Sequence, residues 1–177
     1  MSGVINGERV SLREITLADT ASIVRWRNSE NVLKYFIDRT PITPESHERW
    51  LKERVETGRV AQFIIVDNAG GADVGTAFLR DIDKANGAAE FGFFIGEEGA
   101  RGRGLGGESC SLLCAYAFNE LGLRRVTARV LAFNTRSAAV FERAGFKKEG
   151  AARERIVCGD GCCDVVFYSL TKEDFNG

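Results

Sequence analysis

Short hydrophobic runs, each ended by a turn, dominate the middle of the chain. Between residues 60 and 96 the runs are rich in Val, Ile and Phe, and they are separated by Asn68–Gly71 and Lys84–Gly87. Both separators have the composition of hairpin turns. The pattern therefore predicts three successive antiparallel strands, at about 61–67, 73–82 and 88–95.

Helical spacing marks the first third of the chain and two later segments. The first helix is capped by Thr16, with Asp19 three residues later, and it is expected to end near Asn28. Pro, Gly and Asn at the appropriate ends predict three further helices, at about 44–58, 105–121 and 134–145. Other strands are expected at about 10–14, 125–131, 146–152 and 165–170.

This order of elements predicts a single domain over residues 1–177 with an α+β fold. Three antiparallel strands, followed by a helix and a strand that returns to the sheet, make a mixed and mostly antiparallel sheet with one central βαβ unit. The domain divides into a helical region (1–58), a central core (60–146) and the C-terminal strands (147–177).

The charge balance restricts the partners and the location. The 24 Lys and Arg residues face 25 Asp and Glu residues, whereas a nucleic-acid-binding domain usually has a basic excess, so no nucleic acid partner is expected. A binding site for an anion would therefore have to be formed by a few neighbouring basic residues. Met1–Arg9 lacks the apolar core of a signal peptide, and no apolar run approaches the ~20 residues that cross a bilayer. We therefore expect a cytoplasmic protein with no membrane partner.

The cysteines and the histidine do not indicate a metal site. Five cysteines with irregular spacing are not typical of a secreted disulfide framework, so we expect reduced thiols. Cys158, Cys162 and Cys163 flank the Gly-Asp-Gly of an expected hairpin turn, and the single histidine, His47, is distant in sequence. Because the paired ligand spacing of a zinc site is missing, no metal is expected.

The segment Arg101–Gly107 lies between an expected strand and an expected helix. Its backbone N–H groups would converge at the positive end of a helix dipole, and its glycines would let an anion approach them. Two arginines add the local cationic spot. The sequence therefore predicts a phosphate-binding loop, and the alternative is a flexible loop with two solvated arginines.

Gly102, Gly104 and Gly107 also fit the dinucleotide pattern G-x-G-x-x-G. In that motif a strand runs directly into the first glycine, and the second strand ends in Asp or Glu about twenty residues later. Here Gly96–Ala100 intervenes, and the second strand is followed by Phe-Asn with no carboxylate. A dinucleotide-dependent enzyme is therefore disfavoured, and a Walker loop is excluded because no Lys followed by Ser or Thr is present.

The chain resembles the GNAT acetyltransferases of the RimJ/RimL type in three motifs, which have the order and spacing found in that family. The motifs are the strand Ala89–Ile95, the loop Arg101–Gly106 and the segment Asn134–Phe146. The resemblance covers nearly the whole chain. It implies a GNAT-type sheet with helices on both faces, and transfer of an acetyl group from acetyl-CoA to a primary amine. The branch includes N-terminal acetyltransferases of ribosomal proteins, polyamine acetyltransferases and enzymes that act on nucleotide-linked amino sugars.

The resemblance also implies which residues bind the cofactor. Backbone amides of the loop contact the pyrophosphate, and pantetheine pairs with the end of the preceding strand, where Gly92 suits a bulge. Asn134 corresponds to a family asparagine near the reactive end of the cofactor, and it is also a preferred helix N-cap. The expected cofactor-binding residues are Phe93, Phe94, Ile95, Arg101, Gly102, Arg103, Gly104, Leu105, Gly106, Gly107 and Asn134.

Acetyl transfer needs an uncharged amine, a stabilised oxyanion and a protonated leaving thiolate. Glu90 lies in an otherwise apolar strand where family members often have the general base; the alternative is a carboxylate that faces solvent or pairs with a basic neighbour. A backbone amide near Phe94 is the implied oxyanion donor. Many family members have Tyr as general acid where this chain has Phe141, so Ser137 is the candidate acid, although a helix serine is usually structural.

Acceptor specificity is expected from the helical region, where Tyr35 and Phe36 are also candidates, and from the last hairpin, because the cofactor motifs occupy the middle of the chain. A Trp-Arg-Asn motif and a His-x-x-Trp motif resemble those of the amino-sugar enzymes, so the candidate acceptor-binding residues are Trp26, Arg27, Asn28, His47 and Trp50. Aromatic rings suit a sugar or a base and arginine suits a phosphate. For either tryptophan, the alternative is core packing.

The expected acceptor is a small amine, in the first place a nucleotide-linked amino sugar. A ribosomal-protein N-terminus and a polyamine are the alternatives, and a polyamine is disfavoured because acidic and basic residues are interleaved in the helical region. A non-catalytic acyl-CoA-binding module is a further alternative, since Phe141 cannot donate a proton. The chain is expected to be a monomer or a homodimer.

Overall fold

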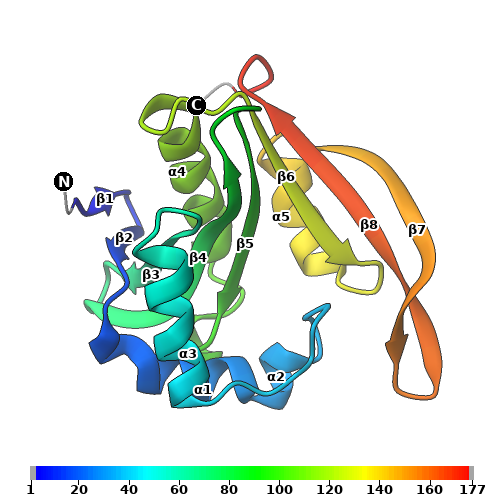
Figure 1. The fold of residues 1–177 in the computed structure, drawn as a ribbon, viewed down its shortest axis with the longest axis horizontal. Coiled ribbons are helices and arrows are strands. Elements are labelled where there is room, and N and C mark those ends of the chain that lie inside the picture. The colour runs from blue at the N-terminus through cyan, green and yellow to red at the C-terminus, as the bar shows by residue number, and fades with distance from the viewer. Residues whose placement is uncertain (1–2, 176–177) are drawn as a thin grey trace.

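The computed structural model describes residues 3–175; residues 1, 2, 176 and 177, the ends of the expected domain, lie outside the described part. Its centre is one eight-stranded sheet in the order β1-β2-β3-β4-β5-β6-β8-β7 (Figure 1). Neighbouring strands are antiparallel except for β5 and β6, which run parallel. The strands are β1 (Ile5–Asn6), β2 (Val10–Glu14), β3 (Ala61–Asp67), β4 (Ala72–Asp83), β5 (Ala88–Ile95), β6 (Arg125–Leu131), β7 (Lys147–Cys158) and β8 (Gly161–Thr171).

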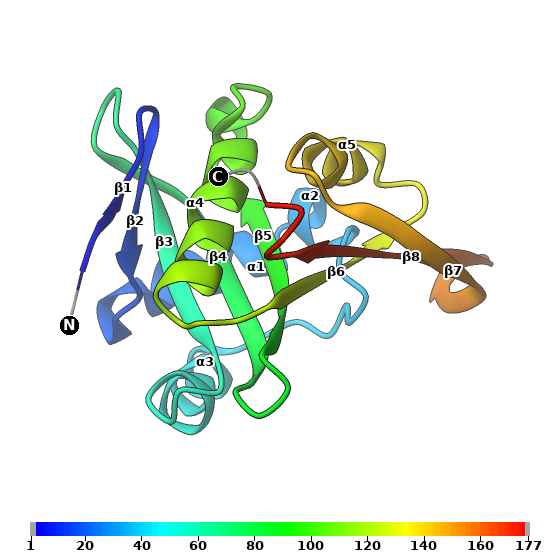
Figure 2. The same ribbon diagram turned by 90° about the horizontal axis from the view of Figure 1, so that it is seen from above.

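The helices lie in three connections of the sheet. Between β2 and β3 are α1 (Thr20–Asn28), α2 (Glu30–Leu33) and α3 (Pro44–Trp50), the last continued by a π-helical segment, Leu51–Val55. Between β5 and β6 lies α4 (Leu105–Asn119), and between β6 and β7 lies α5 (Thr135–Arg143). Because α3 lies on one side of the sheet and α4 and α5 on the other (Figure 2), the predicted α+β fold with helices on both faces is confirmed.

Side chains of β3 alternate between two hydrophobic cores. Phe63 and Ile65 belong to the larger core, which includes buried residues of α4, whereas Ile64 belongs to the smaller one together with Ile23 and Trp26 of α1. The helices between β2 and β3 therefore pack as a separate wall on one face of the sheet.

The parallel pair β5 and β6 separates after a short contact. Ala88–Glu90 pairs with Arg125–Thr127, and within the described residues no further pair joins the two strands. β5 continues beside β4 to Ile95 and β6 continues beside β8 to Leu131, so the two strands move apart (Figure 1). We call this opening the β5–β6 divergence. Along it, within the described part of the chain, residues 91–95 present a strand edge that has no partner strand on this side.

Two predicted elements are longer or more divided than expected. The first predicted helix consists of a 3-10 turn, Leu17–Asp19, followed by α1, because the Asp19 carboxylate accepts a hydrogen bond from the Thr16 N–H at 2.8 Å and tightens the entry. The last two strands, predicted at 146–152 and 165–170, form a long hairpin that turns at Gly159, where φ is +62°.

The prediction of reduced thiols is wrong for the hairpin, where Cys158 and Cys163 form a disulfide across neighbouring strands. Cys110 and Cys114 are free and buried in α4, and Cys162 is free and exposed. Within residues 3–175, no helix is both long enough and apolar enough to span a membrane. Nor does this part of the chain group three His, Cys, Asp or Glu side chains as a metal site requires.

Candidate active site

The glycine-rich loop turns the chain from β5 into α4. Gly102 and Gly104 have φ values of +76° and +79°, a left-handed conformation that glycine adopts without a Cβ clash, and Gly104 is the N-cap of α4. The first-turn N–H groups of this 15-residue helix therefore open toward the loop. This is the arrangement in which backbone amides bind a phosphate.

Both arginines of the loop hold it to the sheet. Arg101 donates from Nε to the Ile95 carbonyl at 3.2 Å and from Nη2 to the Gly96 carbonyl at 3.3 Å, which closes the end of β5. Arg103 forms an ion pair with Asp67 of β3 at 2.5 Å, and this hydrogen bond lowers the pKa of the Asp67 carboxyl. The arginines thus fix the loop, and the amides at the start of α4 remain the donors predicted for the anion.

Gly106 allows α4 to approach β5. The residue is buried, and a Cβ at this position would lie 2.5 Å from Cε2 of Phe93. The Phe93 ring centroid lies 5.8 Å from that of Phe91 and 6.0 Å from that of Phe141. Phe141 is only 3% exposed, so the position where many GNAT enzymes have a catalytic tyrosine is occupied by a ring of the core.

Asn134 and Ser137 form the cap of α5, just beyond the end of β6. Asn134 Oδ1 accepts from the Ser137 N–H at 3.3 Å, and Asn134 Nδ2 donates to Ser137 Oγ at 2.9 Å. Asn134 therefore has the N-cap role that the sequence left open. Both side chains are half-buried, and the hydroxyl of Ser137 keeps its own proton available for donation.

The segment after α2 crosses the β5–β6 divergence. Phe36 contacts Phe94 of β5, with ring centroids 5.6 Å apart, and Tyr35 contacts Phe133, which follows β6, at 5.8 Å. Tyr35 and Phe133 are 37% and 47% exposed. Two accessible aromatic rings, those of Tyr35 and Phe133, thus lie beside the start of α5, and Phe133 directly precedes its cap residue Asn134. Tyr35 belongs to the helical region from which acceptor specificity was expected, whereas Phe133 was not predicted as a site residue, because its proximity to Tyr35 depends on the path of this segment.

Trp26 packs in the core at the end of β5. It is 2% exposed, its ring lies against Gly96, and its Nε1 donates to Glu97 at 2.7 Å. Hydrogen bonds from Arg25 and from Trp26 lower the pKa of the Glu97 carboxyl. This placement is the core packing that the sequence left open as the alternative to ligand contact.

Arg27 and Asn28 hold the segment that crosses the divergence. Arg27 is 9% exposed, donates to the Asp38 carbonyl, and places its guanidinium carbon 3.6 Å from the Phe36 ring centroid. Burial lowers the pKa of Arg27. Asn28 exchanges two hydrogen bonds with the backbone of Ile42, at 2.7 and 2.9 Å. Arg27 and Asn28 of the Trp-Arg-Asn motif therefore hold the inside of the region that is predicted to bind the acceptor.

His47 and Trp50 attach α3 to its neighbours. His47 is 4% exposed, its Nδ1 lies 3.0 Å from Thr20 Oγ1 of α1, and burial lowers its pKa. Trp50 is half-buried and donates from Nε1 to Gln62 Oε1 of β3 at 3.2 Å. The structure thus brings the five acceptor candidates together in the helical connection between β2 and β3, where Trp26, Arg27 and His47 are buried against protein partners. We call residues 16–60 of this connection the acceptor wall, after the role predicted for it.

Glu90 lies between two arginines. Its carboxylate forms ion pairs with Arg80 of β4 and with Arg129 Nε of β6, the latter at 3.0 Å, and its side chain is 15% exposed. The sequence left open a pairing with basic neighbours, and this is what the structure contains. The isolated, desolvated carboxylate expected of a base is not observed. Arg80 and Arg129 were missed, because only the strand pairing brings them to Glu90.

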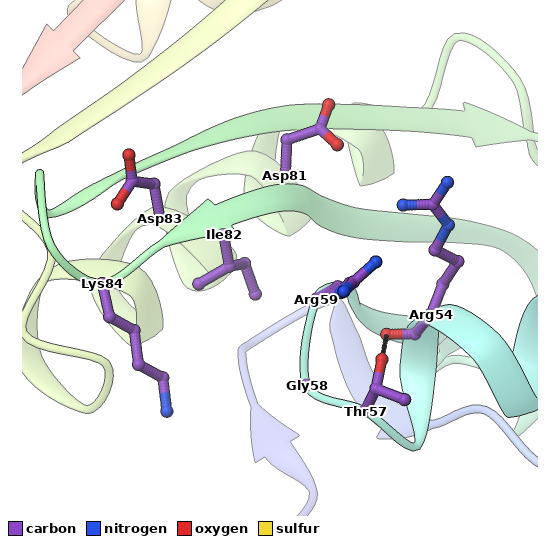
Figure 3. A pocket seen from close by; sticks show the side chains of 8 residues that line it. All are labelled: Arg54, Thr57, Gly58, Arg59, Asp81, Ile82, Asp83 and Lys84. Atoms are coloured by element: carbon purple, nitrogen blue, oxygen red, sulfur yellow. Dashed lines mark hydrogen bonds between the residues drawn. The ribbon is translucent and has the colours of Figure 1, made fainter.

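A separate surface pocket of about 580 Å³ lies where the π-helical segment ends beside the β4–β5 hairpin (Figure 3). Three basic and two acidic side chains contribute to it, and no predicted site residue lines it. Its lining residues are Arg54, Thr57, Gly58, Arg59, Asp81, Ile82, Asp83 and Lys84.

Three features together define the class of protein. They are a parallel strand pair that diverges, a helix capped by glycine after the first of these strands, and a helix capped by asparagine after the second. The sequence matches the Acetyltransferase (GNAT) domain over residues 9–147, and the chain belongs to this family. The family predicted from the sequence motifs is therefore confirmed, and the chain is an acetyl-CoA-dependent N-acetyltransferase.

Several relatives match over nearly their full length. The uncharacterized N-acetyltransferase p20 of Bacillus licheniformis is 30% identical, with 96% of this chain and 97% of that protein covered. The putative ribosomal N-acetyltransferase YdaF of Bacillus subtilis (strain 168) is 30% identical, with 94% and 87% covered. The structure of spermidine N-acetyltransferase from Vibrio cholerae in complex with CoA and spermine superposes with a TM-score of 0.89 at 20% identity, covering 97% of this chain and 100% of that chain. At this identity the similarity concerns the fold.

Proposed function

We propose that this chain transfers the acetyl group of acetyl-CoA to the primary amine of a small acceptor, in the first place a nucleotide-linked amino sugar. The β5–β6 divergence carries the proposal. It combines an unpaired strand edge at 91–95, a phosphate-binding loop at the end of that strand, and the capped start of α5 on the opposite side. This combination suits a long ligand with a pyrophosphate at one end and a reactive thioester at the other.

Each part of the cofactor has a matching part of the chain. The amides at the start of α4, from Gly104 onward, suit the pyrophosphate. The free edge of Phe93–Ile95 suits the pantetheine amides, because an extended ligand pairs with an exposed strand edge through main-chain hydrogen bonds. The thioester then lies toward Asn134 and Ser137.

The proposed chemistry uses few side chains. The acceptor ammonium loses a proton to water held by Glu90, its nitrogen attacks the thioester carbon, the C–N bond forms and the C–S bond breaks. A backbone N–H near Phe94 stabilises the oxyanion, and the Ser137 hydroxyl donates a proton to the leaving thiolate. As the intermediate collapses, the nitrogen loses its second proton, which returns to Ser137, so that the products are the neutral amide and the thiol of CoA. To serve as base, Glu90 has to exchange one guanidinium partner for this water molecule, since both carboxylate oxygens contact arginine.

The acceptor class is supported by the residues beside the divergence. The accessible rings of Tyr35 and Phe133 suit a sugar ring or a base, because aromatic faces bind apolar ring surfaces. A polyamine would need several carboxylates there, and the carboxylate at the start of the divergence, Glu90, is already bound to two arginines.

A metabolite experiment tests the acceptor class. An extract is incubated with the chain and isotope-labelled acetyl-CoA, and labelled products are identified by mass spectrometry. We expect label on an amino sugar linked to a nucleotide. Released CoA is quantified by chromatography, because the exposed free thiol of Cys162 would react with a thiol reagent. Label confined to spermidine would refute the acceptor assignment.

A protein N-terminus is the second candidate acceptor. It is supported by the 30% identity to the putative ribosomal N-acetyltransferase YdaF. Incubation with intact ribosomal proteins in the same assay separates the two candidates, because a shift of one acetyl group on an N-terminal peptide would favour the second.

A further inference from the structure

Arg129 is an arginine whose orientation is fixed and whose terminal groups are free. It lies on β6 two residues beyond Thr127, the last residue paired with β5, and therefore inside the β5–β6 divergence. Its Nε donates to both oxygens of Glu90, at 3.1 and 3.0 Å. Within residues 3–175, its two terminal nitrogens donate to no protein atom, and the side chain is 32% exposed.

Arg80 adds a second positive charge at the same carboxylate. It is the direct partner of Glu90 across the antiparallel β4–β5 pair, forms an ion pair with it, and is 31% exposed. Its Nε is buried and has no hydrogen-bond partner in the described part of the chain. Two guanidinium groups on one carboxylate leave a net positive charge at this place.

These charges lie on the acceptor side of the sheet. Side chains two and four residues apart on a strand point to the same face, and directly paired residues share a face as well. Glu90 therefore shares its face with Phe94, which contacts Phe36 of the acceptor wall, and Arg129 shares its face with Thr127, the partner of Glu90. The free groups of Arg129 thus face the space between the sheet and the acceptor wall.

We propose that Arg129, held by Glu90 and assisted by Arg80, binds a phosphate group of the acceptor. A guanidinium tethered through Nε presents a planar pair of N–H donors that matches two phosphate oxygens, and its orientation is fixed before the ligand arrives. Glu90 is then a positioning residue for this contact. The proposal rests on the proposed acetyl transfer to a small amine and adds that the enzyme selects acceptors that carry a phosphate.

The test compares two amines that differ only in a phosphate and includes a third amine that carries a carboxylate. The values of kcat/KM are measured for glucosamine and for glucosamine 6-phosphate, and an amino acid with a free carboxylate serves as a non-phosphate anion. For the wild type we expect the phosphorylated sugar to be preferred at least about tenfold over the unphosphorylated one, as for a hydrogen-bonded charged pair. Arg129→Gln should lower this preference ratio about tenfold through KM of the phosphorylated sugar, and Arg129→Lys should lower it less.

Arg125→Gln is the matched control. Arg125 lies on the same strand, is similarly exposed at 35%, and is paired with one carboxylate, Glu149, at 2.7 Å. It is four residues from Arg129, about 13 Å along the strand, so its replacement should keep the preference ratio within about twofold. Circular dichroism and the melting temperature of each variant show whether it is folded.

The outcomes separate the two proposals. If none of these amines yields an acetylated product, the proposed transfer to a small amino-sugar acceptor fails. If products form but the wild type shows no phosphate preference, or prefers the carboxylate, or if Arg129→Gln and Arg129→Lys retain the full preference, the role of Arg129 is refuted. A preference that falls equally in Arg125→Gln refutes it as well, because general surface charge is then sufficient.

Discussion

Gly106→Ala is the substitution for which the structure gives the sharpest expectation. The added Cβ would lie 2.5 Å from Cε2 of Phe93 and 3.2 and 3.3 Å from two further ring atoms. Carbon atoms in normal contact are about 3.5–4.0 Å apart, so the ring or the helix has to move. Such overpacking costs about 1–3 kcal/mol.

Gly107→Ala is the matched control, one residue further along the same helix. A Cβ at Gly107 would meet nothing within 4 Å. Both substitutions replace a helical glycine with alanine and gain up to about 1 kcal/mol from helix propensity. This gain cancels in the comparison, so the free energies of unfolding of the two variants should differ by about 1–3 kcal/mol.

Thermal unfolding without ligand measures this difference. For a chain of this length, each kcal/mol shifts Tm by about 2–4 °C, so Gly106→Ala should melt about 2–12 °C below Gly107→Ala. Its KM for acetyl-CoA should also rise, because Phe93 lies on the strand edge proposed for pantetheine. Adding Phe93→Leu should restore part of the stability. If Gly106→Ala melts as high as its control, α4 does not need a glycine to approach β5.

The other predictions concern protonation and chemistry. Burial lowers the pKa of His47 below its usual 6.5, so the unfolded chain binds a proton that the folded chain does not, and stability should fall as pH drops through about 6.5; His47→Gln should reduce this slope in denaturant titrations. Ser137→Ala should lower kcat at least about tenfold if the hydroxyl protonates the thiolate, and an unchanged kcat would remove Ser137 from the chemistry. Glu90→Gln should slow transfer most below the pKa of the acceptor amine if Glu90 is the base, whereas a purely positioning role predicts a pH-independent loss of phosphate preference. Acetyl-CoA should raise Tm, and an equal rise with NAD would contradict the cofactor assignment.

Local patterns were sufficient to predict the elements around the cofactor site. The hairpin turns, the strand Arg125–Leu131 and the start of α4 are where turn residues and glycine spacing placed them. The same patterns did not show that Trp26 is a core residue, because helical spacing alone does not say which neighbour an aromatic ring meets. Nor did they predict the Cys158–Cys163 disulfide, which depends on how far the last hairpin extends.

The ion pairs of Glu90 are an example of contacts that local sequence patterns could not predict. Its partners are ten and thirty-nine residues away in sequence, and strand register alone brings them together. A one-residue change in either pairing would turn the partner to the other face of the sheet. The sequence therefore identified the carboxylate, and the structure was needed to identify its arginines.

The path of the chain through β2 and β3 has a consequence for how acceptor range can change. Glu14 pairs with Phe63, and the Ile15 N–H donates to the Gln62 carbonyl at 3.2 Å, so everything between them leaves and rejoins the sheet at adjacent positions. The whole acceptor wall, about 45 residues, is thus a continuous segment that could be replaced as a unit without changing the strands on either side. Consider a chimera in which this segment is replaced by the corresponding segment of another family member. It should prefer the acceptor ring that the other protein prefers and still select acceptors with a phosphate, because Arg80 and Arg129 lie in the unchanged sheet.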